Sequence, residues 1–142
     1  MSSVALSTIV LTFACASLTM LGEPCHAETI VFTNQANPVF NSGSAKIVFV
    51  DAVEALEAQI SEGLPADPSQ AAAEAKRRIE GPSGRRFING MRDAQQGVAD
   101  AWSLQVEKLP AVVVDRAYVT YGISDVGAAE ELIASSREAP KP

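Results

Sequence analysis

The sequence predicts an α/β domain in which helices pack against a mixed β-sheet. Residues 29–33, 45–50 and 111–114 are short runs rich in β-branched residues, a composition typical of strands. Between the second and third runs, apolar residues recur at helical spacing in three successive segments. The resulting order is two strands, three helices, a strand pair and a last helix. Every apolar face in this order is buried if the helices cover a central sheet.

Residues 1–27 have the features of a cleavable secretory signal. Residues 4–22 carry no charge and are rich in apolar side chains, and Cys25 and Ala27 place small residues at the positions that signal peptidase requires. The residues before this stretch contain no Lys or Arg, however. Two alternatives stay open. One is an uncleaved membrane anchor, because the stretch approaches the usual span of ~20 residues; the other is lipidation at Cys15, although the residues before it form a poor lipobox.

After cleavage we expect a single domain at 28–137, a disordered tail at 138–142 and a periplasmic location. The chain has a net charge of −6. Cleavage of the leader removes one acid and no base, which leaves a net charge of −5. An acidic domain argues against direct binding of nucleic acid. The basic residues at 76–78 and 85–86 are better explained as a solvated helix face and loop.

The predicted leader contains both cysteines, Cys15 and Cys25, and the single histidine, His26. The mature domain would therefore have no thiol chemistry, no Cys or His nucleophile–base pair and no ordinary zinc site. Helix faces and caps account for nearly all of its carboxylates. We therefore expect a protein that is not an enzyme and uses no cofactor or metal. A fold-related enzyme with other chemistry is the alternative.

Strand boundaries follow from alternation and turn residues. The first strand is predicted at Thr29–Thr33, before a turn. The second, at 45–50, is nearly all apolar and is expected to be covered on both faces. The runs at 111–114 and 118–121 are three residues apart and predict an antiparallel hairpin.

Capping residues place the first two helices. Asp51 followed by Glu54 has the pattern of a capping box, and Gly63 would end that helix. Asp67 before Pro68 predicts the next N-cap, with a helix running to about residue 80.

The longest predicted helix spans 83–105. Its apolar stripe is expected to be core, and the stripe consists of Phe87, Met91, Ala94, Val98, Ala101 and Trp102. Gly90 and Gly97 weaken the helix or let another element approach closely. Ser124 is expected to cap a last helix from Asp125 to about Arg137.

The segment 108–114, followed by a hairpin, Gly122 and a helix, resembles the C-terminal half of the thioredoxin fold. This resemblance implies a thioredoxin-like three-layer sandwich with a mixed sheet. It also implies a cis peptide bond at Pro110, where an ordinary trans proline at a strand start is the alternative. Redox thioredoxins carry Cys-x-x-Cys after the first strand, and residues 35–40 here contain no cysteine.

Thioredoxin-like proteins often bind an extended peptide beside this proline. By resemblance, a partner-binding groove would lie between Leu109–Pro110 and the loop after the first strand. Its predicted residues are Asn34, Asn37, Pro38, Leu109 and Pro110.

Several segments in the right order resemble a family of small exported proteins encoded in integrating conjugative elements. The segments are 31–33, 63–68, 96–98, 101–104, 110–115, 118–122 and 125–126. The family looks related to the thioredoxin-like pilin-assembly proteins of F-type conjugation systems. The resemblance implies a non-catalytic periplasmic accessory or assembly factor of a conjugative type IV secretion apparatus. Its partners would be other apparatus proteins, with no small-molecule substrate and with membrane contact only through an uncleaved signal. A periplasmic peptide-binding chaperone outside conjugation is the alternative.

Overall fold

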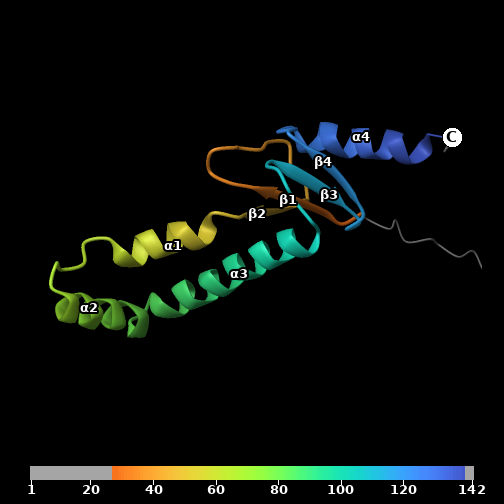
Figure 1. Cartoon of the computed structure of the whole chain (residues 1–142). Coiled ribbons are helices and arrows are strands. Elements are labelled where there is room, and N and C mark those ends of the chain that lie inside the picture. Colours follow the sequence, from red (N-terminus) through yellow and green to blue (C-terminus); the bar gives the residue numbers. More distant parts are fainter. Residues whose placement is uncertain (1–26, 140–142) are drawn as a thin grey trace, which may run out of the picture.

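The computed structural model describes residues 27–139, so the predicted leader, with Cys15, Cys25 and His26, lies outside the described residues. Within this range the chain forms a four-stranded sheet and four helices (Figure 1). In chain order the elements are β1 (Thr29–Thr33), β2 (Lys46–Phe49), α1 (Ala52–Ser61), α2 (Pro68–Glu80), α3 (Gly84–Ser103), β3 (Ala111–Val114), β4 (Tyr118–Tyr121) and α4 (Val126–Glu138). The predicted order of elements is confirmed. Glu138, which the sequence places in the disordered tail, is the last residue of α4.

The sheet is mixed and open, with the strand order β2-β1-β3-β4. β2 pairs with β1 in parallel, whereas β3 pairs with β1 and with β4 in antiparallel fashion. The predicted hairpin is confirmed, with Ala111 opposite Tyr121. Ala111 also lies opposite Phe32, so the chain entering β3 runs beside the end of β1. The peptide bond between Leu109 and Pro110 is cis, as the resemblance implied.

Helices cover both faces of the two central strands. On one face, Ile30 and Phe32 of β1 form a buried cluster with Ala101 of α3. On the other, Val31 of β1 forms a second cluster with Val126 of α4. All five residues of β1 and all four of β3 are buried, because each central strand has a neighbour on both sides and a helix on both faces.

α1 and α2 pack against α3 and extend away from the sheet (Figure 1). Arg78 of α2 holds the two helices together, since its guanidinium donates to the backbone oxygens of Ile60 at 3.0 Å and Glu62 at 2.6 Å. The predicted cap of α2 is confirmed: the Asp67 carboxylate accepts from the Gln70 N–H at 2.9 Å. Among residues 27–139, no helix has the length and apolar character needed to cross a bilayer.

The prediction that the second strand is covered on both faces is wrong. β2 lies at the edge of the sheet, and only Val48 is buried. α3 covers Val48, but α4 packs on β3 and β4 rather than on β2, so Ile47 and Phe49 are 39% and 44% exposed. Apolar composition alone did not distinguish an edge strand from a central one.

The predicted capping box at Asp51 is also wrong. Asp51 precedes α1, yet its side chain makes no cap hydrogen bond. Its carboxylate accepts instead from the backbone N–H of Gln35 at 2.9 Å. The Asp51 side chain therefore bonds to a residue distant in sequence, in the loop after β1, and not to an N–H group in the first turn of its own helix.

The core stripe predicted on α3 is confirmed only in part. Ala94 and Ala101 are buried and Phe87, Met91 and Val98 are half-buried, whereas Trp102 is 81% exposed. Consecutive residues point about 100° apart on a helix, so Trp102 faces away from the direction that buries its neighbour. Gly97 does allow a close approach, since a Cβ there would lie 2.6 Å from Cγ1 of Val48.

Asp125, rather than the predicted Ser124, caps α4. Its carboxylate accepts from the Ala128 N–H at 3.2 Å and from the Asn41 side-chain amide at 3.0 Å. Phe40 pairs with the same segment: its N–H donates to Ser124 and its carbonyl accepts from Val126. The long loop between β1 and β2 is thereby attached to the start of α4.

The Asp125 contacts predict a pH dependence of stability. The Asn41 amide and then the backbone N–H groups of α4 lower the pKa of Asp125 from its ordinary value. A lowered folded-state pKa stabilises the fold above the unfolded-state pKa, and this contribution is lost as the pH falls through the folded-state pKa. Asp125→Asn keeps a good N-cap but cannot titrate. In urea denaturation, we expect wild type to be more stable than Asp125→Asn near neutrality and the difference to shrink in acid. A difference independent of pH would contradict this assignment.

Candidate binding groove

The end of α3 is closed by a Schellman motif. The Val106 N–H donates to the Ala101 carbonyl at 3.0 Å, and the Gln105 N–H donates to the Trp102 carbonyl at 3.1 Å. Gln105 has a φ of 54°, the left-handed conformation that this motif requires. The chain therefore reverses directly after α3 and returns along the sheet toward Pro110.

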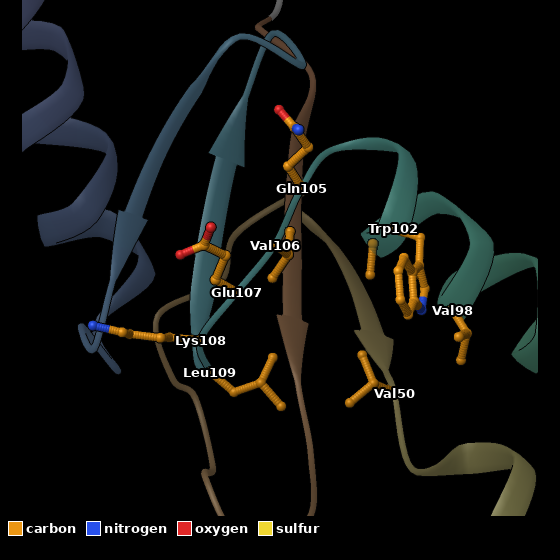
Figure 2. Close-up of a pocket in the computed structure, with 9 residues that line it drawn as sticks. Val50, Val98, Trp102, Gln105, Val106, Glu107, Lys108 and Leu109 are labelled. Carbon is orange, nitrogen blue, oxygen red and sulfur yellow. The ribbon is translucent and has the colours of Figure 1, made fainter.

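An apolar groove of about 520 Å³ lies between the end of α3, this returning segment and the end of β2. It is lined by Val50, Val98, Ala101, Trp102, Gln105, Val106, Glu107, Lys108 and Leu109. Val50, Val106 and Leu109 also pack against the buried cluster beneath the groove. In Figure 2 the side chains of Val106, Leu109 and Val50 surround the hollow, with Trp102 on its α3 side and Lys108 extending away. The floor is thus part of the core, and Trp102 forms an exposed wall.

The backbone along one side of the groove is unpaired. Among residues 27–139, no hydrogen bond is formed by the backbone N–H groups or carbonyls of Glu107, Lys108 and Leu109. The next carbonyl, that of Pro110, accepts from the Gly122 N–H at 2.9 Å. Free backbone groups beside an apolar groove are the features with which proteins bind an extended peptide by strand addition.

The structure separates the predicted site residues. Leu109 lines the groove, and Pro110 is buried directly after it. Asn34 and Asn37 instead form a turn, in which the Asn37 amide donates to Oδ1 of Asn34 at 2.7 Å. Thr33 fixes the same turn by donating from Oγ1 to the Asn37 carbonyl. Pro38 follows the turn and is exposed, and it does not line the groove.

Sequence reasoning missed most of the groove lining. The sequence pattern places Trp102 in the core and Val50 within a strand, whereas both line the groove. Glycine is the usual signal for the chain reversal after a helix, and position 105 is glutamine, so the Schellman motif was not predicted. A helical projection of α3 places Trp102 at the margin of the apolar stripe. The sequence therefore does contain a signal for the groove wall that Trp102 forms.

The charged side chains that line the groove are those of Glu107 and Lys108. Among the described residues, no three His, Cys, Asp or Glu side chains gather as the ligands of a metal ion would. Glu107 and Lys108 are exposed at the rim and supply one charge of each sign. The groove is therefore suited to an apolar side chain of an extended peptide, whose polar backbone continues on either side of that side chain.

The fold and the groove define a class: an α/β protein with a mixed four-stranded sheet and an open apolar groove beside the proline that precedes β3. Residues 26–139 match a family described as a protein of unknown function, DUF1525, and the chain belongs to this family. No curated protein and no solved structure matches the chain.

Proposed function

We propose that the protein is a non-catalytic periplasmic accessory factor of a conjugative type IV secretion apparatus, and that it acts by binding an extended segment of another apparatus protein. The apolar groove with the unpaired backbone of 107–109 at its side is the observation that carries the binding role. The leader-like residues 1–27 and the resemblance to proteins of integrating conjugative elements support the place of action.

The sheet order and the terminal hairpin and helix support a thioredoxin-like interpretation of the fold. The mature chain from residue 28 onward contains no Cys and no His, which favours binding over thiol or imidazole chemistry. The proposed groove is lined by different residues from the groove expected from sequence. It uses Leu109 together with the α3 end, in place of the Asn34–Pro38 loop.

Trp102 supplies the first test. Because its side chain is 81% exposed, Trp102→Ala should leave the free energy of unfolding nearly unchanged. A tryptophan at the centre of an interface typically contributes ~2 kcal/mol or more, so partner binding should weaken by roughly thirtyfold. We expect DNA transfer by a donor strain to fall correspondingly when it carries Trp102→Ala.

Leu132→Ala is the matched control, since Leu132 is 50% exposed on α4 and does not line the groove. This variant should transfer DNA like wild type. Normal transfer by a strain lacking the whole gene would contradict the conjugative role. Normal transfer by Trp102→Ala alone would contradict the role of the groove.

A further inference from the structure

The exposed side of α3 continues from the groove as a distinct stripe. Its residues follow one another at spacings of three and four, which places them along one side of the helix. They are Arg85, Ile88, Arg92, Gln95, Ala99 and Trp102, and all six are exposed. Ile88 is 44% exposed, so the stripe also offers apolar surface.

The charge of this stripe is opposite to that of the whole chain. It contains two arginines and no acid, whereas the chain has a net charge of −6. Ion pairs among residues 27–139 use Lys46, Lys76, Arg77, Arg78 and Arg137, and none uses Arg85 or Arg92. Both guanidiniums are therefore left without a carboxylate within the described part of the molecule.

The neighbouring acids of α3 do not neutralise the stripe. Asp93 and Asp100 are seven residues apart and share another side of the helix. Asp100 is already engaged, because its carboxylate accepts from Gln96 at 2.9 Å and lies 4.0 Å from the Lys46 ammonium. The stripe therefore complements a ligand that brings its own negative charge.

We propose that the segment bound in the groove continues along this stripe and is acidic there. This inference rests on the proposed function, and it specifies the chemistry of the partner. Trp102 belongs to both the groove wall and the stripe, so one continuous ligand can occupy both.

Helix geometry gives the spacing of the acidic residues. At 1.5 Å per residue, Arg92 lies about 15 Å and Arg85 about 25 Å from Trp102 along α3. An extended peptide advances about 3.4 Å per residue. An apolar anchor beside Trp102 should therefore be separated from the acidic residues by about four to five and about seven to eight positions.

An acidic peptide is favoured over an anionic membrane as the occupant. The groove is a hollow that a side chain can fill, whereas a lipid surface is broad and would also meet Asp93 and the acidic remainder of the chain. The experiment below also measures binding to an anionic membrane.

The test measures binding of synthetic peptides to the exported protein by the fluorescence of Trp102, the single tryptophan of the chain. One peptide carries a leucine-rich anchor and Glu at the two predicted spacings. A second has Gln in place of each Glu, and a third has the same composition with the Glu residues moved next to the anchor. Two exposed ion pairs predict that the first peptide binds about three- to tenfold more tightly than the others at low salt.

Variants assign this preference to the stripe. In Arg85→Glu/Arg92→Glu the advantage of the acidic peptide should disappear or reverse, and high salt should reduce it in wild type. Lys76→Glu/Arg77→Glu is the matched control, because it also reverses two exposed charges, and each of them is paired with a glutamate of α2. It should preserve the preference.

The outcomes separate the two proposals. Equal binding of all three peptides, unaffected by the charge reversal, would overturn this inference and leave the groove as a binding site. Failure of every peptide to bind would overturn the inference together with the proposed groove function. A salt-sensitive Trp102 response to phosphatidylglycerol vesicles, without a preference among peptides, would overturn the inference in favour of a membrane surface.

Discussion

Phe32→Ala is expected to lower the free energy of unfolding by about 3–5 kcal/mol. Phe32 is fully buried in β1, one of the two central strands, and belongs to the cluster beneath α3. Removal of the Phe32 ring leaves a cavity between the sheet and α3. The close approach of Gly97 to Val48 already fixes the position of α3 against the sheet. Since a domain of this size has a stability of about 5–15 kcal/mol, the variant should be close to unfolding.

Urea denaturation followed by circular dichroism measures this effect. Phe40→Ala is a matched control that deletes the same atoms from a side chain 58% exposed, while the backbone hydrogen bonds of Phe40 to Ser124 and Val126 remain possible. We expect a loss below about 1 kcal/mol for the control. Similar losses for the two variants would show that the sheet core has been assigned incorrectly.

Gly84→Ala is expected to cost about 3 kcal/mol or more, the upper part of the range for overpacked sites. A Cβ at position 84 would lie 1.5 Å from the backbone oxygen of Ile79, at the tight connection between α2 and α3. Backbone cannot move aside as a side-chain tip can, so α2 must shift or lose its last turn. Hydrogen exchange should show the loss of protection concentrated in α2.

Gly90→Ala provides the control within the same helix. A Cβ there makes an ordinary contact with Leu56 at 3.6 Å, and alanine is favoured over glycine inside a helix by up to about 1 kcal/mol. This variant should be as stable as wild type or more stable. A destabilised Gly90→Ala alongside a tolerated Gly84→Ala would contradict the arrangement of the three helices.

Elements with strong local signals were predictable from sequence. β1 and the β3–β4 hairpin have the predicted bounds, because β-branched runs between turn residues define both. The start of α2 was predicted for a similar reason, since Asp67 and the following Pro68 form a complete local cap. In each case the residues that determine the element are neighbours in sequence.

Features that depend on distant partners were not predictable. Asp51 bonds to Gln35 and does not cap its own helix, and Asp125 takes an additional partner from Asn41. The open edge of β2 follows from where α4 packs, which its own four residues do not encode. The groove depends in the same way on the chain reversal at Gln105, so only Leu109 of the five predicted residues lines it.

The proposed function depends on a segment of an apparatus protein occupying the groove beside Trp102. Its most direct test is photo-crosslinking in donor cells, with a photoreactive phenylalanine analogue at position 102 and, in a second strain, at position 132. We predict a discrete adduct with a conjugation protein from position 102 and none from position 132. No adduct at position 102, or the same adducts from both positions, would contradict the proposed binding in the groove.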